Sequence, residues 1–154
     1  MGLKCGIIGI TNTGKTTLFN CVSETKVATS NFAFSTNKSN LGQVKVPDER
    51  LQVLDSLVHS AKVVPTTVDI VDIPGLTKGS SKGEGVGNSF LSDIRNCDAL
   101  IHVVRCFDDP NLPHIDTTID PVRDRETIDL ELQVKDLESI EKKIVKAEKA
   151  AKAG

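Results

Sequence analysis

The segment from Gly9 to Thr16, GITNTGKT, constrains the fold of this 154-residue chain more than any other feature. It matches the pattern GxxxxGK[ST] at every fixed position. A short apolar run, LKCGIIGI, leads into it, and KTTLFNCVS, with apolar residues at helical spacing, follows it. A glycine loop between a buried strand and a helix is the arrangement in which backbone N–H groups curl around a phosphate. The pattern therefore predicts a phosphate-binding loop rather than an ordinary glycine turn.

Each residue type in this loop has its own physical task. Gly9 and Gly14 allow backbone angles and a close approach that a Cβ would block. Lys15 places a compact cation beside the β- and γ-phosphates, where it is also expected to act in catalysis by neutralising charge. The Thr16 hydroxyl is a hard oxygen ligand for Mg²⁺. The predicted nucleotide-binding residues are Asn12, Thr13, Gly14, Lys15, Thr16 and Thr17.

A second part of the site is expected where the apolar run 63–73 ends. Asp72 is placed there to hold Mg²⁺ through a water, as the acidic partner of the phosphate loop. Asp69 lies an odd number of residues away, so it faces the other side of an extended strand and is expected to be structural. Gly75 is a predicted catalytic residue, because its N–H can approach the γ-phosphate after the turn that Pro74 fixes.

A third metal ligand is expected from a threonine in the polar, turn-rich loop 30–40. Such a loop can close over the γ-phosphate and its metal and open after hydrolysis. Thr36 is our choice, and Ser35, Thr29 and Thr25 compete with it. A glycine-rich segment, 74–87, comes later in the chain and is expected to be mobile when nothing holds it.

Alternating strand and helix patterns predict a three-layer α/β fold with a mostly parallel sheet, and the loop motif at 9–16 makes this fold one of the P-loop NTPase type. Strands are expected at 3–10, 41–46, 63–73 and 99–104, and helices at 15–23, 49–60 and 88–96, with a loop at 107–123. Asp48 is the expected cap of the second helix, which carries Leu51, Leu54, Leu57 and Val58 on one face. Four strands are few for such a domain, so the sheet is expected to be incomplete.

The pattern of apolar and charged residues changes in the segment from about Glu126 to Lys152. Apolar or alanine residues recur there at gaps of three and four, with charges between them, which predicts a long helix of coiled-coil type. A single surface helix packed on the domain is the alternative. The predicted organisation is a nucleotide-binding domain over 1–123 and a helical arm over 124–154.

Composition excludes several other classes of protein. Nineteen Lys and Arg against 21 Asp and Glu give a net charge of −2, and aromatic residues make up 3%, so we expect no direct DNA binding. No stretch approaches the roughly 18 apolar residues of a membrane span, and no secretion signal opens the chain, which favours a cytoplasmic location. The four cysteines fit no metal spacing and are expected to be reduced core thiols; they are Cys5, Cys21, Cys97 and Cys106.

Several segments together resemble a translation-factor-type GTPase domain and, more closely, the Obg-related YchF family, also called Obg-like ATPases. These segments are KCGI at 4–7, NTGKTTLFN at 12–20, VPTT at 64–67, DIPGL at 72–76, SKGEG at 81–85, GNSFL at 87–91 and HVVRCF at 102–107. The resemblance implies a switch protein that hydrolyses MgATP, or alternatively GTP, and that is associated with ribosomes and stress responses. It also implies that a coiled-coil insertion interrupts the nucleotide domain and that a small TGS domain follows.

The resemblance gives a meaning to three further features. Leu76 stands where Ras-like enzymes carry the glutamine that orients the attacking water, so we expect slow hydrolysis that needs backbone groups, a cation or a partner. Asn12 matches an asparagine that related GTPases associate with a K⁺ ion near the phosphates, so K⁺ is a hypothesis here. The expected switch segment includes Leu76, Gly79, Lys82, Gly83 and Glu84.

One feature of GTPases is missing from this sequence. No NKxD segment for guanine selection occurs, and in the family a variant motif that favours adenine follows the coiled coil. The chain is therefore expected to be an N-terminal piece of a longer protein, with 99–104 as an unprotected sheet edge that promotes self-association. A nucleotide-stabilised binding module with negligible turnover is the alternative to an enzyme.

Arg95 and Arg105 are expected to be surface or ion-pair residues, and His102 is expected to be a core or edge histidine.

Overall fold

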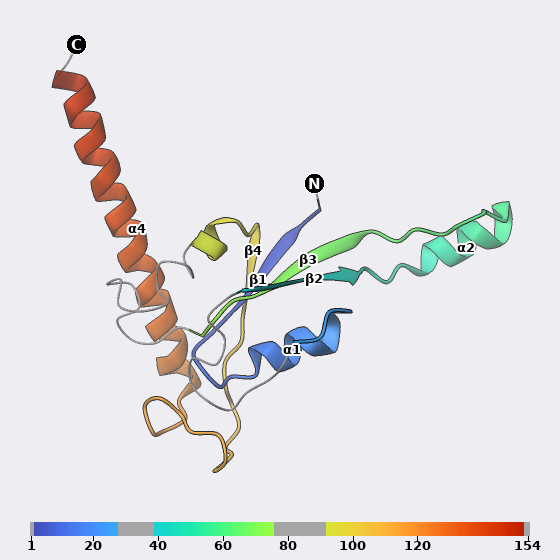
Figure 1. The fold of residues 1–154 in the computed structure, drawn as a ribbon, viewed down its shortest axis with the longest axis horizontal. Helices are drawn as coiled ribbons and strands as arrows, with labels where there is room; N and C mark the ends of the chain where they lie inside the picture. Colours follow the sequence, from blue (N-terminus) through green and yellow to red (C-terminus); the bar gives the residue numbers. More distant parts are fainter. Residues whose placement is uncertain (1, 28–38, 76–91, 153–154) are drawn as a thin grey trace.

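The computed structural model of the chain describes residues 2–27, 39–75 and 92–152 (Figure 1). Its regular elements follow one another as strands and helices in the predicted alternation. They are β1 (Lys4–Ile8), α1 (Lys15–Val22), β2 (Asn40–Lys45), α2 (Glu49–Val58), β3 (Thr67–Asp72), β4 (Ala99–His102) and α4 (Pro121–Lys152). One further helical turn covers 92–95, within the predicted helix 88–96, whose residues 88–91 lie outside the described residues.

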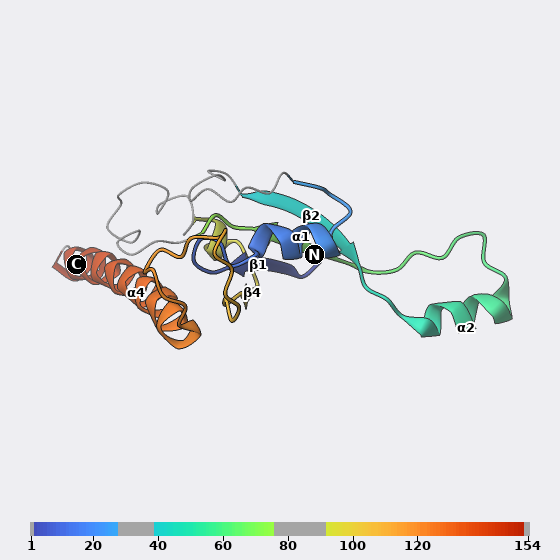
Figure 2. The ribbon, with the colours of Figure 1, turned by 90° about the horizontal axis from the view of Figure 1, so that it is seen from below.

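The four strands form one sheet in the order β2-β3-β1-β4. β1 runs parallel to both neighbours, with Ile7 opposite Asp72 of β3 and Ile8 opposite His102 of β4. β2 is antiparallel to β3. The chain between β2 and β3 carries α2 away from the sheet (Figures 1 and 2), so it returns without the crossover that a parallel pair requires. The prediction of a mostly parallel sheet is confirmed.

Two apolar clusters lie on opposite faces of the sheet, because successive strand residues point to opposite sides. One cluster contains Ile7, Ile70 and Phe19 of α1. The other joins β1 and β3 to the long helix and consists of Ile8, Ile10, Val71, Ile73 and Ile128. Helices therefore cover both faces of the sheet, which confirms the three-layer α/β fold.

The helix α2 forms as predicted but does not pack as its apolar face suggests. Asp48 caps it by accepting a hydrogen bond from the Arg50 N–H at 3.0 Å. No residue of the helix is buried, and Leu57 is 73% exposed. The pattern predicts an apolar face, but among the described residues none buries it.

The long helix α4 is confirmed, but it begins at Pro121 rather than near Glu126, so the loop predicted for 107–123 is wrong over its last three residues. Proline fits the first turn of a helix, and the Asp120 carboxylate accepts the Val122 and Arg123 N–H groups, each at 3.1 Å. The first turns pack on the sheet through Ile128, which is fully buried. Farther along, the predicted seam is exposed at Leu130, Leu137, Ile140 and Ile144.

The cysteines differ from the expectation in their burial. All four are free, as predicted, but only Cys5 is buried and Cys97 is half-buried. Cys21 and Cys106 are exposed, so the assignment to the core is wrong for these two, because an apolar neighbour in sequence does not fix the direction of a side chain.

Among the described helices, none combines the length and the apolar character that crossing a membrane requires.

Candidate functional site

The loop between β1 and α1 has the backbone that the motif predicts. Gly9, Asn12 and Gly14 all have positive φ angles, of 151°, 60° and 90°. A Cβ on Gly9 would lie 2.4 Å from the Val103 carbonyl oxygen, so only glycine fits at this crossing point of β1 and the segment after β4. Gly14 is the N-cap of α1, and no described side chain caps the helix. The backbone N–H groups of the first helical turn can therefore bind an anion.

Lys15 lies inside this curl rather than in solvent. Its Nζ donates a hydrogen bond of 2.6 Å to the Ile10 carbonyl, which also accepts from the Thr13 hydroxyl at 3.1 Å. Burial lowers the pKa of Lys15 from 10.5 to about 8, although the charge of Asp72 acts in the opposite direction. The loop thus holds a desolvated amine whose cationic form a polyphosphate would favour.

Thr16 and Asp72, two of the three predicted metal ligands, are in direct contact. The Thr16 hydroxyl donates to Asp72 Oδ2 at 2.8 Å. Burial raises the pKa of the Asp72 carboxyl, and the Thr16 hydrogen bond and the Lys15 charge counteract part of this effect. Asp72 Oδ1 is buried and has no hydrogen-bond partner among the described residues. A hydroxyl and a buried carboxylate with a spare oxygen fit Mg²⁺, which prefers oxygen ligands.

The neighbouring predictions on β3 also have a clear geometry. Asp69 accepts a hydrogen bond from Gln43 Nε2 at 3.0 Å, away from the phosphate loop, in the structural role expected for it. Beyond β3, the chain passes against the phosphate loop at Gly75, where a Cβ would lie 3.0 Å from the backbone of Thr11. The structure therefore brings Gly75 beside the loop. Thr17, by contrast, is exposed in the first turn of α1.

Several predicted residues lie outside the described part of the chain. These are Thr36 with its competitors Thr29 and Ser35, and the switch residues Leu76, Gly79, Lys82, Gly83 and Glu84. Of the competitors for the third metal ligand, Thr25 is described. It is exposed beyond the C-terminal end of α1, whereas Thr16 is at the other end, so Thr25 is poorly placed for this role.

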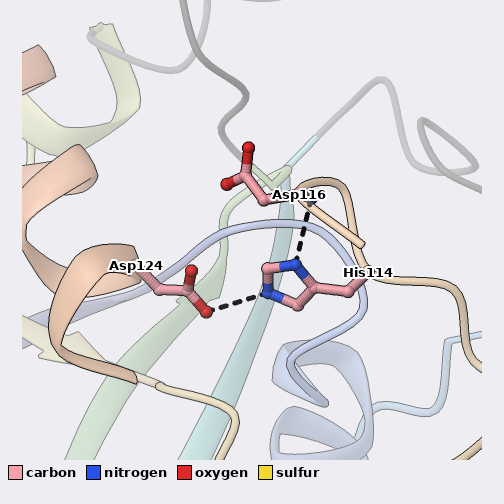
Figure 3. A group of neighbouring side chains, drawn as sticks. All are labelled: His114, Asp116 and Asp124. Carbon is pink, nitrogen blue, oxygen red and sulfur yellow. Dashed lines mark hydrogen bonds and ion pairs between the residues drawn. The ribbon is translucent and has the colours of Figure 1, made fainter. Parts of the chain in front are cut away.

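Sequence reasoning missed a cluster that adjoins the phosphate loop (Figure 3). His114 and Asp124 form a buried pair, with 2.9 Å between Nε2 and Oδ2, and the Asp116 N–H donates to His114 Nδ1 at 3.1 Å. The Asn12 side-chain amide donates to the Pro113 carbonyl at 3.1 Å, which places the cluster next to the loop. Spacing gave no signal, because Asp124 belongs to α4 and lies ten residues from His114.

This cluster has the donor types of a metal site but is already satisfied internally. The three residues offer ligand atoms within 4.8 Å of one another. Both ring nitrogens of His114 are engaged, and the Arg123 guanidinium lies 3.3 Å from Asp124 and 3.6 Å from Asp116. A cation held between two of the three ligands opposes a metal ion there, so the cluster is better described as an ion-pair network.

The predictions for three other polar residues have different outcomes. His102 is half-buried on β4, at the edge of the sheet that the described residues form, as expected, and burial lowers its pKa. Arg95 is exposed and donates to the Ser139 hydroxyl of α4, also as expected. Arg105 was expected at the surface or in an ion pair, and this is wrong: it is 1% exposed and donates to backbone carbonyls instead. Carbonyl partners leave no trace in a sequence.

Comparisons with known proteins identify proteins that are similar to this chain. A family model described as 50S ribosome-binding GTPase matches residues 4–149. The ribosome-binding ATPase YchF of Bacillus subtilis is 49% identical over 152 residues, which cover 99% of this chain and 42% of that protein. The protein of the same name from Shigella flexneri is 46% identical over 154 residues, again 42% of its length. These matches confirm the resemblance to the YchF family.

A solved structure extends the similarity to the fold. The structure of the Schizosaccharomyces pombe YchF GTPase is 40% identical to this chain, with a TM-score of 0.72. The similarity covers 96% of this chain and 39% of that one. The chain therefore spans about two fifths of the length of the relatives that it matches.

Proposed function

We propose that this chain, which belongs to the 50S ribosome-binding GTPase family, binds a nucleoside triphosphate with Mg²⁺ in the loop 9–16 and hydrolyses it. The observation that carries the proposal is the meeting of Lys15, Thr16 and Asp72. Their parent elements, α1 and β3, bring a buried amine, a hydroxyl and a buried carboxylate to one edge of the sheet, with the Thr16 and Asp72 oxygens 2.8 Å apart. Loop amides, a lysine and oxygen ligands are the groups that phosphoryl transfer requires.

The proposed reaction is an in-line transfer of the γ-phosphoryl group to water. Lys15 and the backbone N–H groups of the loop neutralise charge that develops on the phosphate oxygens. Thr16 and Asp72 hold Mg²⁺, and we propose Thr36 as a further ligand. When bound, Mg²⁺ supplies charge neutralisation at the phosphate oxygens. The Gly75 N–H, beside Thr11, is proposed to donate to the γ-phosphate.

Positioning of the attacking water is the weak point of this chemistry. Leu76 has no group that can orient a water, so we propose slow turnover in the chain alone. We propose that a K⁺ ion near Asn12 takes over part of the role that a water-orienting side chain has in other enzymes. Hydrolysis rates measured in matched K⁺ and Na⁺ buffers test it, and equal rates in the two buffers would remove K⁺ from the proposal.

We propose ATP as the preferred nucleotide and GTP as the alternative. The YchF relatives from Bacillus subtilis and Shigella flexneri are named ATPases, whereas the Schizosaccharomyces pombe relative is named a GTPase. Calorimetric titration of this chain with ATP and with GTP, each with Mg²⁺, tests the binding site, and the same titrations of a full-length version test the choice of base.

Ribosome binding, with a link to translation or stress regulation in the cytoplasm, is our proposal for the wider role. The two bacterial relatives are named ribosome-binding. We propose residues 1–123 as the nucleotide domain and 124–154 as the first arm of a coiled coil; the exposed seam at Leu137, Ile140 and Ile144 supports this arm.

A binding module in which the nucleotide is only a structural ligand is the second candidate, favoured by Leu76. Phosphate release measured with and without ribosomes separates the two candidates. Turnover well above background in the chain alone favours the enzyme, whereas nucleotide binding without release in either condition favours the module.

A further inference from the structure

Arg105, which follows β4, has surroundings that an arginine rarely occupies. Its side chain is 1% exposed, and in the described part of the chain no carboxylate lies within ion-pair distance of it. Its donors reach three backbone carbonyls instead: Nε to Phe107 at 3.1 Å, Nη1 to Leu112 at 2.9 Å and Nη2 to Asp109 at 3.3 Å. The guanidinium also lies 5.0 Å from the centroid of the Phe107 ring.

A buried guanidinium is costly unless its N–H groups are hydrogen-bonded. Here all three carbonyl partners come from one short loop, 107–112, which is wrapped around the planar fork of Arg105. That fork has donors in fixed directions, so it determines where each carbonyl lies. Within the loop, the Leu112 N–H closes a turn onto the Asp109 carbonyl at 3.0 Å. Arg105 joins this turn to Phe107 and so connects the two ends of the loop.

The residue that follows this loop touches the phosphate loop. The Pro113 carbonyl accepts a hydrogen bond from the Asn12 side-chain amide at 3.1 Å. Pro113 is fixed from both sides: Arg105 holds the Leu112 carbonyl before it, and His114 after it is paired with Asp124 of α4 (Figure 3). The proline ring restricts φ as well, so the position of this carbonyl is well defined.

Asn12 is the residue of the phosphate loop for which such a contact matters most. Its φ of 60° is in the left-handed region, which asparagine tolerates better than most side chains but which still costs free energy. A residue with a left-handed backbone conformation turns successive backbone N–H groups toward a common anion. A fixed partner for the Asn12 side chain therefore stabilises the curl that the phosphates need.

We propose that Arg105 is a positioning residue of the nucleotide site: by ordering 107–112 it sets the Pro113 carbonyl against Asn12 and so holds the phosphate loop in its binding conformation. This inference rests on the proposed function, because it concerns affinity for the same triphosphate. It predicts that a change at Arg105 weakens nucleotide binding through Asn12, although Arg105 itself touches no nucleotide.

The test is a double-mutant cycle read by calorimetric titration with MgATP and, separately, MgGTP. Arg105→Lys keeps the charge but loses the fork, and Asn12→Gly removes the contact at its other end without the strain that alanine would add at a φ of 60°. Each change is expected to weaken affinity about tenfold, as for one lost hydrogen bond, and the double variant no more than either alone. Arg95→Lys is the matched control, because Arg95 is exposed and bonds to Ser139 of α4, and its affinity should equal that of the wild type.

The outcomes separate the inference from the function on which it rests. Losses that multiply to about 100-fold in the double variant, or wild-type affinity in Arg105→Lys, overturn the positioning role. If thermal unfolding shows that Arg105→Lys does not fold, Pro113→Gly replaces it in the cycle, since it loosens the carbonyl and leaves Arg105 intact, and additive losses then overturn the inference. A wild-type chain that binds neither nucleotide overturns the proposed function itself.

Discussion

The Thr16 hydroxyl donates a hydrogen bond to the Asp72 carboxylate at 2.8 Å, although 56 residues separate the two in the sequence. The contact follows from sheet topology. β1 and β3 are parallel neighbours with Ile7 opposite Asp72, so the loop after β1 and the end of β3 meet at the same edge. Ligand sites in open α/β sheets form at this carboxyl-terminal edge, where helix N-termini also gather. Substitutions at or beside this pair therefore test the proposed function of the chain.

Asp72→Asn is expected to separate the contribution of Asp72 to folding from its role in metal binding. Burial raises the folded-state pKa of Asp72, so the ionised carboxylate destabilises the nucleotide-free chain above that pKa, and the neutral amide should raise the free energy of unfolding at pH 7. Nucleotide affinity in the presence of Mg²⁺ should fall about tenfold or more, because a charged ligand is lost. Chemical denaturation and calorimetry measure the two effects.

Asp69→Asn is the matched control, since Asp69 is on the same strand and bonds to Gln43 away from the loop. Its nucleotide affinity should depend on Mg²⁺ as in the wild type. An Asp72→Asn variant with the wild-type dependence on Mg²⁺ would remove Asp72 from the metal site.

Lys15→Met is expected to abolish triphosphate binding while the chain stays folded. Methionine fills the volume of the lysine stem without its desolvated amine, but it cannot neutralise phosphate charge, so we expect a loss of about 100-fold or more. Lys45→Met is the control, because Lys45 is exposed and pairs with Glu24. Unchanged nucleotide affinity in Lys15→Met, with a normal unfolding transition, contradicts the assignment of the site.

Nucleotide affinity should depend on pH around the titration of Lys15. Its pKa is about 8 in the nucleotide-free chain, so the amine is cationic below that pH and neutral above it. A polyphosphate favours the cation, and affinity should therefore fall above pH 8 by up to about tenfold per pH unit. Titrations at pH 7, 8 and 9 in buffers of different ionisation enthalpy measure the affinity and the proton uptake, and a flat profile without proton uptake contradicts the prediction.

The same pKa has a consequence for stability that can be measured without nucleotide. Because the folded-state pKa of Lys15 is below 10.5, the unfolded chain binds more protons between about pH 8 and pH 10.5. The contribution of Lys15 to the free energy of unfolding therefore rises with pH in this window. Lys15→Met should lack this contribution, so the difference between variant and wild type gives its size.

Three features could be predicted from the sequence because each depends on a local pattern. The phosphate loop follows from fixed motif spacing, the three-layer fold from strand–helix alternation, and the place of Asp72 from a polar residue at the end of a strand. Contacts that join distant segments were harder. Arg105 satisfies its donors with backbone carbonyls, which every residue has, so no sequence signal marks its burial. Asp120 before Pro121 is a recognisable helix start, and weighing that pair would have placed the beginning of α4 correctly. The apolar face of α2 shows that a pattern predicts a face and not its partner.

The long helix should respond to substitution in two different ways along its length. Ile128 is fully buried between the helix and the sheet, so Ile128→Ala should lower the free energy of unfolding by about 2–4 kcal/mol. Leu137 is 56% exposed on the seam, and Leu137→Ala should change it by less than about 0.5 kcal/mol. Chemical denaturation of both variants compares the two values. Equal losses would mean that the seam is already covered in solution.

Self-association is expected through β4, which pairs with β1 on one side and is at the edge of the described sheet. Leu100 and Ile101 on this strand are 40% and 39% exposed, and an apolar strand edge is a template for pairing with another copy. Light scattering over a wide concentration range should show a mass above the monomer, and Ile101→Lys should restore the monomer. Val53→Lys, on the exposed face of α2, should leave association unchanged; if it restores the monomer instead, copies meet through α2. A clean monomer of the wild type at every concentration contradicts the prediction.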